Sequence, residues 1–280
     1  MNIVYVFIFI MCILFYIHIF YHLKISNEET IYEIDYQGKK HLEEVCDLRQ
    51  PFTLHIQQDP RGLLQRKQLE KYDIPFNVIK KNTIENVDKE TKQTTTTTNI
   101  YSEYNKKLLD HNDVKEKNSK VERFLIPDFS LWNQHDVIVS DTDFSTPLQC
   151  NYFYRNYIHL NEGNIKIRIV PPKEEPKLDG HFESDLFKHV SKCDIWKTDK
   201  NTINYFEITG ELGDIVYIPP HWWYSIQFQE PSVLCCYHYR TLINILAYLP
   251  KYLKSFTAIT KQNTIETTKK AKQKKVKLKK

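Results

Sequence analysis

GDIVYIPPHWWYS, residues Gly213–Ser225, is the stretch of this sequence that decides the fold. Apolar residues dominate Asp214–Ile218, and a second strand signal follows at Ser225–Phe228. Pro219 and Pro220 separate the two runs, and proline cannot donate a hydrogen bond within a strand ladder. The stretch therefore predicts two short strands joined by a turn.

Further strand signals lie on both sides of this stretch. They fall at Asp136–Val139, Tyr152–Leu160, Ile165–Val170, Ile203–Ile208 and Val233–Tyr239. Short strands separated by turns are typical of a sandwich or a barrel rather than of alternating βα units. The 18 Tyr and 15 Phe, beside only 6 Gly, also favour strands. We therefore expect a mainly β chain.

The rest of the chain divides by composition. Residues 25–84 mix short apolar runs with charged segments, which indicates strands and a helix that belong to the same ordered domain, 25–245. Residues 85–120 hold five consecutive threonines and many charges, so we expect a disordered insertion in a surface loop. Thr241–Phe256 has apolar residues at helical spacing, and Pro250 should kink or restart that helix. A C-terminal helical segment is expected over 246–268.

The N-terminal segment is strongly apolar. From Ile3 to Phe20 only His18 is strongly polar, and a helix of this length would be about 27 Å long, close to a bilayer core. A signal peptide would need a basic start and a small-residue cleavage site, and the sequence has neither. A buried core helix is the other alternative. We expect residues 1–24 to form an uncleaved transmembrane anchor, with the membrane as partner through residues 3–20.

The flanking charges predict the orientation of this anchor. Lys24, Lys39 and Lys40 follow the apolar segment, and no lysine precedes it, which favours a cytosolic body. The sequence holds no N-x-[ST] glycosylation acceptor. Its six cysteines are scattered without a C-x-x-C spacing, so neither a disulfide framework nor a zinc site is expected. We predict a single-pass membrane protein.

The C-terminal tail, Lys269–Lys280, carries eight lysines and no acidic residue. Without those lysines the formal net charge of +4 would become −4, so the body is mildly acidic. Such a tail can bind anionic lipid head groups or nucleic-acid phosphates. It can equally be a solvated, disordered terminus. The sequence leaves these three alternatives open.

Several motifs resemble a known family. Gly213–Ser225 resembles the distal strand-turn-strand of Jumonji-type and cupin-like hydroxylases, which reads G-D, three hydrophobic residues, then I-P-P-x-W-W-H-S. TPLQCN at Thr146–Asn151 resembles their T-x-x-H-x-D strand, and CDLRQP at Cys46–Pro51 resembles their N-terminal strand. The resemblance implies a double-stranded β-helix (a cupin or jelly-roll barrel) with flanking helices. Similar anchored cupin-like chains are common in large DNA viruses.

The same resemblance places three replaced metal ligands, which we call the triad positions. Active members hold Fe(II) with an H-x-D pair and a distal His, and leave coordination positions open for 2-oxoglutarate and oxygen. The corresponding residues here are Gln149, Asn151 and Tyr224. Amides are weak neutral donors, and a phenol stays protonated near neutral pH. We therefore expect no bound metal or cofactor and no catalytic residue.

The co-substrate site is altered as well. The lysine that family members use against 2-oxoglutarate falls at Ile165, and Lys166 should point to the opposite face of its strand. Thr146 keeps its expected identity. Thr146, Lys166, Trp222 and Trp223 are the further residues that could line a pocket, although core packing is the expected role of the two tryptophans.

The sequence also contains residues for a relocated metal site. His181 and Glu183 spell H-x-E, and His221, His189 or His238 could supply a third ligand. Structural or exposed histidines are the simpler interpretation. The leading hypothesis is a non-catalytic scaffold or binding module whose protein partner the sequence does not identify. The alternatives are an Fe(II)- and 2-oxoglutarate-dependent oxygenase (a hydroxylase or demethylase) with relocated ligands, and a cupin that binds a sugar or another small molecule.

Overall fold

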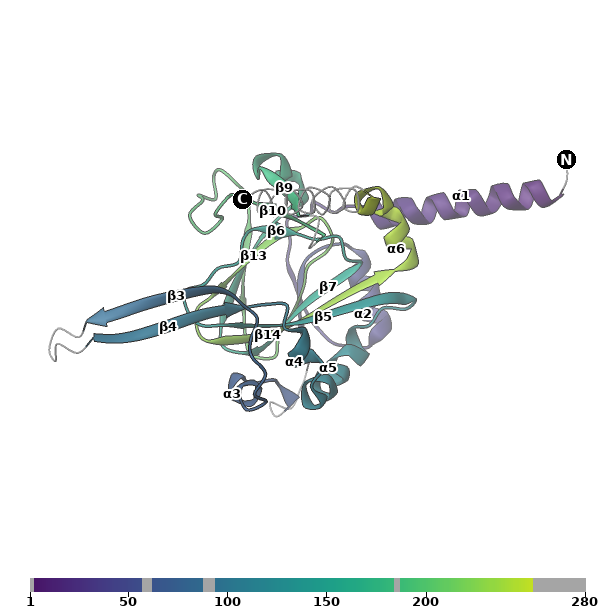
Figure 1. The fold of residues 1–280 in the computed structure, drawn as a ribbon. Coiled ribbons are helices and arrows are strands. Elements are labelled where there is room, and N and C mark those ends of the chain that lie inside the picture. The colour runs from purple at the N-terminus through teal and green to yellow at the C-terminus, as the bar shows by residue number, and fades with distance from the viewer. Residues whose placement is uncertain (1–2, 57–61, 88–93, 184–186, 254–280) are drawn as a thin grey trace, which may run out of the picture.

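The computed structural model describes residues 3–56, 62–87, 94–183 and 187–253. Within these residues the strands form two sheets, and one long helix, α1, projects from the body (Figure 1). The larger sheet has the order β1-β2-β12-β7-β14-β5-β4-β3, and the smaller has the order β11-β8-β13-β6-β10-β9. β1 and β2 pair in parallel, whereas the other pairs are antiparallel.

The strands of the larger sheet, in chain order, are β1 (Tyr32–Asp35), β2 (Phe52–His55), β3 (Val78–Val87), β4 (Thr94–Ser102), β5 (Ser130–Ser140), β7 (Arg155–Glu162), β12 (Ile215–Tyr217) and β14 (Ser232–Thr241). Those of the smaller sheet are β6 (Gln149–Cys150), β8 (Ile165–Val170), β9 (Gly180–Glu183), β10 (Lys188–Ser191), β11 (Phe206–Gly210) and β13 (Trp223–Phe228). The strands expected on both sides of Pro219 and Pro220 are therefore present as β12 and β13.

The helices are α1 (Ile3–Leu23), α2 (Lys39–Asp47), α3 (Arg66–Glu70), α4 (Lys106–Leu109), α5 (Asn112–Leu125), the 3₁₀ helix η2 (Pro172–Lys177) and α6 (Leu242–Ala247). A further helical segment begins at residue 249 and continues to 253, the last described residue, so the helix is interrupted at Tyr248, two residues before Pro250. Residues 254–268 of the expected C-terminal helical segment, and the Lys269–Lys280 tail, lie outside the described residues.

The central strands of the larger sheet, β7, β12 and β14, are buried on both faces. On β7, Tyr157 belongs to a core that it shares with α2 and α5, whereas Ile158 and Leu160 pack against the smaller sheet. This division follows from the alternation of side chains along a strand. Thus α2 and α5 cover one face of these strands, and the smaller sheet packs on the other.

The described parts of this segment, residues 85–87 and 94–120, correct the expectation of a disordered insertion. β3 and β4 form a long hairpin that extends from the body, and the threonine run forms part of β4 (Figure 1). Threonine is β-branched and suits a strand. In α5, Val114, Val121 and Leu125 are buried in the core at helical spacing, and Asn118 accepts a hydrogen bond from Tyr237. The many charged residues of this segment lower its average hydrophobicity, so its composition gives no sign of these buried apolar positions.

The N-terminal helix agrees with the length expected of a membrane span. Ile3–Leu23 has a mean hydropathy of 2.7 over its most apolar window, and none of that window is buried against the body. The helix is long and apolar enough to cross a membrane, a property that it shares with signal sequences. Its last turn meets the body, where His22 is buried and Ile19 packs beside Ala247 and Tyr248.

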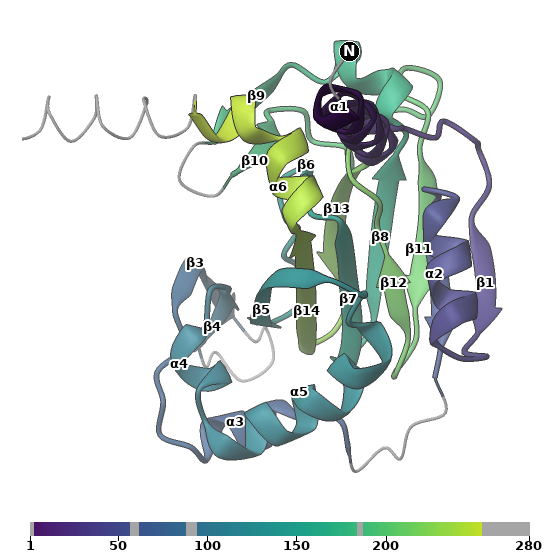
Figure 2. The same cartoon turned by 90° about the vertical axis from the view of Figure 1, so that its right-hand side faces the viewer.

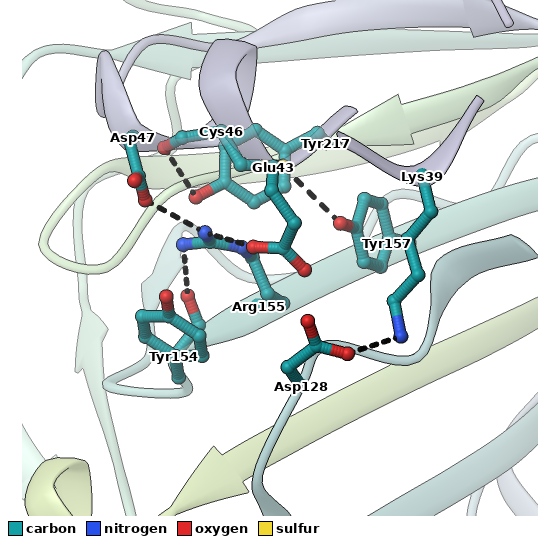
Figure 3. Close-up of polar contacts among 9 residues, drawn as sticks. All are labelled: Lys39, Glu43, Cys46, Asp47, Asp128, Tyr154, Arg155, Tyr157 and Tyr217. Atoms are coloured by element: carbon teal, nitrogen blue, oxygen red, sulfur yellow. Dashed lines mark hydrogen bonds and ion pairs between the residues drawn. The ribbon is translucent and has the colours of Figure 1, made fainter. Parts of the chain in front are cut away.

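A buried arginine joins α2 to the larger sheet (Figure 3). Arg155, at the start of β7, is fully buried and donates to Glu43 at 2.8 Å and to Asp47 at 2.9 Å. In the same contact region Cys46 Sγ lies 3.2 Å from Tyr157 Oη. Since arginine stays charged in proteins, the two carboxylates of α2 are needed to compensate the guanidinium.

We predict that the double variant Glu43→Gln/Asp47→Asn loses about 3 to 5 kcal/mol of unfolding free energy, because it leaves a buried cation uncompensated. Chemical denaturation of the full chain in detergent, followed by tryptophan fluorescence, measures the loss. Lys39→Met, which removes the exposed pair with Asp128 from the same helix, is the control and should cost about 1 kcal/mol or less. Equal costs for the two variants would contradict the role given to Arg155.

A second prediction concerns pH. Burial lowers the pKa of His159, on β7, from 6.5 to about 4, so the folded chain keeps this ring neutral where the unfolded chain protonates it. The stabilising contribution is complete above pH 6.5 and is lost as the pH falls towards 4. Between pH 7 and 4.5 the unfolding free energy of the parent chain should therefore fall by about 2 to 3 kcal/mol more than that of His159→Gln. A parent-like pH dependence of His159→Gln would refute this prediction.

Candidate functional site

The triad positions meet where β6 and β13 pair. Gln149 of β6 lies opposite Tyr224 of β13 in the antiparallel register, and Asn151 directly follows β6. Asn151 Nδ2 lies 3.4 Å from Tyr224 Oη. Together with Thr146, these residues line one small cavity, which we call the triad pocket. Thr146 Oγ1 also accepts a hydrogen bond from the backbone N–H of Ile226 at 2.9 Å, which ties the pocket wall to β13.

A lysine that the sequence analysis did not identify also lines the triad pocket. Lys188 begins β10, which pairs with β6 on the side opposite β13. Its ammonium Nζ donates to Gln149 Oε1 at 2.8 Å and to Tyr104 Oη at 3.1 Å. No local motif marks Lys188, because only the pairing of β10 with β6 brings it beside Gln149. The first triad position therefore contacts a cation that belongs to the protein.

Two carboxylates, those of Glu103 and Asp136, line the same pocket. Asp136, on β5, accepts from the backbone N–H groups of Tyr104, Asn105 and Val137 at 2.7–2.8 Å. Burial nevertheless raises the pKa of Asp136 to about 6. Burial lowers the pKa of Lys188, while the nearby charges of Glu103, Glu183 and Asp136 oppose that shift. The ammonium is thus electrostatically balanced by acidic side chains around it.

The pocket does not fit Fe(II) and 2-oxoglutarate. The side-chain oxygen of Gln149 already accepts a hydrogen bond from the Lys188 ammonium. A metal ion bound to the same oxygen would be repelled by that ammonium, since two like unit charges 4 Å apart repel by about 4 kcal/mol at an effective dielectric constant of 20. The second position offers the neutral amide of Asn151. The third offers the phenol of Tyr224, and burial raises the pKa of that phenol further, so both are poor metal ligands. The cavity measures about 70 Å³, whereas small-molecule sites span roughly 300–1,000 Å³.

The other predicted pocket residues lie elsewhere. Lys166 points away from the core and pairs with Glu207 at 3.2 Å, in line with the alternation along β8. Trp222 is buried and donates from Nε1 to the carbonyl of Arg49 at 3.2 Å. Trp223 is buried against Gly180, where the ring leaves no room for a Cβ. Both tryptophans are core residues.

The histidines considered for a relocated site do not converge. His181 lies 3.8 Å from Glu183 on the half-exposed β9. The Nε2 atom of His221 lies 2.8 Å from Tyr248 Oη, and His189 Nδ1 lies 3.1 Å from Tyr152 Oη. His238 does line the triad pocket, where its ring stacks on Phe153. Within the part of the chain that the structure describes, no three His, Cys, Asp or Glu side chains are placed to hold a metal ion.

A larger cleft adjoins the triad pocket and shares Tyr104, Gln134 and Asp136 with it. It measures about 650 Å³ and lies between β5 and the helices α4 and α5. Trp132, which is 56% exposed, forms part of its wall, and Leu131 beside it is 64% exposed. This cleft, unlike the triad pocket, has the volume of a ligand site.

Comparisons with known proteins give a distant relationship. No family model matches the chain. It is 29% identical over 83 residues to "JmjC domain-containing protein D" of Dictyostelium discoideum, an overlap of 28% of this chain and 18% of the relative. The chain thus spans less than a fifth of that protein's length. Among solved structures it resembles "X-Ray structure of E. coli ycfD", with a TM-score of 0.42 and 13% identity over 74% of this chain and 54% of the other.

We predict that Lys188→Met lowers the unfolding free energy by about 2 to 3 kcal/mol, because Gln149 loses a charged donor and the pocket carboxylates lose their counter-ion. Lys166→Met is the matched control, since it removes a half-exposed pair with Glu207 and should cost about 1 kcal/mol or less. Denaturant titrations of both variants at neutral pH provide the comparison. The contacts of Lys188 would be of no energetic consequence if the two losses were equal.

Proposed function

We propose that this chain is a membrane-anchored, cupin-like protein without an intact metal site, which acts as a non-catalytic scaffold or binding module. The observation that carries the proposal is the hydrogen bond from the Lys188 ammonium to Gln149 at 2.8 Å. A fixed internal cation that contacts a triad position competes with a metal ion for the same oxygen. The amide and phenol at the other two positions support the same conclusion.

The strand order supports a double-stranded β-helix as the underlying fold. Four antiparallel strands, β5-β14-β7-β12, lie in the larger sheet, and four more, β11-β8-β13-β6, lie in the smaller one. The two sets face each other across a shared core that includes Ile158, Ile167 and Ile226. In this proposal β1–β4 and β9–β10 are additions to the sheet edges.

The anchor is α1. We infer that this helix spans a membrane and that the body lies on the cytosolic side, in accord with Lys24, Lys39 and Lys40 after the span. The described cysteines are all free, as suits a reducing compartment. The binding surface of the module is, in this proposal, the 650 Å³ cleft beside β5, because the triad pocket is too small for a ligand.

The test is metal and co-substrate binding by the full chain in detergent, prepared without oxygen. We expect the parent chain to retain far less than one Fe(II) per chain and to show no thermal shift with Fe(II) and 2-oxoglutarate, since a ligand of the folded state would raise the melting temperature. Retention near one iron per chain, lost in His181→Ala or His238→Ala, would overturn the proposal in favour of an oxygenase with relocated ligands.

A restored site provides the positive control. The variant Gln149→His/Asn151→Asp/Tyr224→His rebuilds the three ligands, and Lys188→Ala additionally removes the competing ammonium. Removal of Lys188 from the rebuilt site should increase Fe(II) affinity by roughly tenfold or more, because a like charge leaves the site. Equal affinity with and without Lys188 would show that the ammonium does not compete with a metal.

A further inference from the structure

The segment that follows β14 presents apolar side chains to the exterior. Leu242 is 56% exposed, Leu249 is 42% exposed and Leu253 is 59% exposed, and we call these three residues the leucine stripe. Their spacing of seven and four residues places them near one side of a helix, despite the interruption at Tyr248. Exposed apolar side chains grouped in this way mark a contact surface.

The opposite side of the same segment is fixed to the body. Asn244 is buried and donates from Nδ2 to the carbonyl of Tyr152 at 3.3 Å. Tyr248 is buried, with its hydroxyl 2.8 Å from His221 Nε2. Tyr252 stacks on Phe187 with ring centroids 3.8 Å apart. The leucine stripe is therefore held outward by a polar and aromatic inner side, rather than exposed by fraying.

The position of α6 relative to α1 identifies what the stripe faces. α6 contacts α1, and Ile19 of α1 packs in the same cluster as Ala247 and Tyr248. Figure 2, which looks nearly along α1, shows α6 beside the end of that helix and across its axis. Because Ile19 lies in the last turn of the apolar segment, α6 lies at the depth where a bilayer core ends.

The chain beyond the stripe carries a matching charge. Leu253 is the last described residue, and the sequence after it includes the eight lysines of Lys269–Lys280. A lysine cluster next to a membrane is attracted by anionic head groups, at about 1 kcal/mol for each lysine near the surface. An apolar stripe followed by a polybasic segment has the composition of an interfacial membrane contact.

We infer that the leucine stripe is a second membrane contact, which lays α6 in the interface of the bilayer that α1 enters and fixes the body against that surface. This inference rests on the proposed membrane anchor. In this inference the three leucines contact lipid at the boundary between the head groups and the acyl chains. Two points of contact, α1 and α6, restrict rotation of the body about α1, which a single span alone would leave free.

The experiment places a fluorophore at single cysteines of the full chain in phosphatidylcholine and phosphatidylserine vesicles. Cys193→Ala is common to all variants, and the four buried cysteines stay native. Leu249→Cys and Leu253→Cys, each with Cys12→Ala, report on the stripe, and native Cys12 reports on α1. Quenching by lipids brominated in the upper acyl chain is compared with quenching by aqueous iodide.

Leu212→Cys with Cys12→Ala is the matched control, because Leu212 is 57% exposed but lies far from α6. Leu212 lies two residues after Gly210. Gly210 pairs with Ile165, and Ile165 pairs with Phe228, the residue at the opposite end of β13 from Trp223. Trp223, in contrast, shares a cluster with Ala247 and Tyr248. A probe at Leu212 should therefore be quenched by iodide alone.

We expect brominated lipid to quench the probes at Leu249, Leu253 and Cys12. Lipid quenching at Cys12 together with iodide quenching at Leu249 and Leu253 would overturn the membrane role of the stripe while the anchor stands. Iodide quenching at Cys12 would overturn the anchor, and with it this inference. Loss of lipid quenching at the stripe on addition of nucleic acid would also refute the inference, since the tail would then prefer another partner.

Discussion

The compensation of Arg155 by Glu43 and Asp47 is the constraint on which the rest of the structure depends. β7 lies between β12 and β14 in the larger sheet, so its position sets the positions of both neighbours. A guanidinium buried at the first residue of β7 is tolerable only if α2 supplies carboxylates there. The requirement thus fixes α2 against the sheet, where Cys46 of α2 packs in one core with Tyr157 and Tyr217.

A second buried charge shapes the triad pocket in the same way. Lys188 reaches Gln149 and Tyr104, and the acidic residues Glu103 and Asp136 lie in the same cavity. In a metal site the cation is exchangeable, and its ligands must be strong donors. Here the cation is tethered to β10, so a neutral amide oxygen suffices as its partner. The pocket is thereby lined by side chains that contact one another, and the larger cleft beside β5 has room for a ligand.

The sequence predicted much of the fold from short patterns. The turn at Pro219 and Pro220, the strands on each side of it and the apolar N-terminal helix follow from local residue types. Residues 94–120 were predicted wrongly, because the charge and threonine content gave no sign of the buried positions of α5 or of the pairing of β4 with β3. Composition measures average polarity, whereas burial depends on which side of a helix the few apolar residues occupy.

The sequence by itself determined the identity of the groups at the triad positions, and therefore that strong metal ligands are missing there. It also determined an apolar segment of membrane-spanning length and a basic tail. Only the tertiary structure decided that Lys188 meets Gln149, that Lys166 and the two tryptophans lie outside the pocket, and that α6 lies beside α1. The physical reason is that these contacts join residues far apart in the chain. Strand register and helix packing, rather than any local pattern, bring them together.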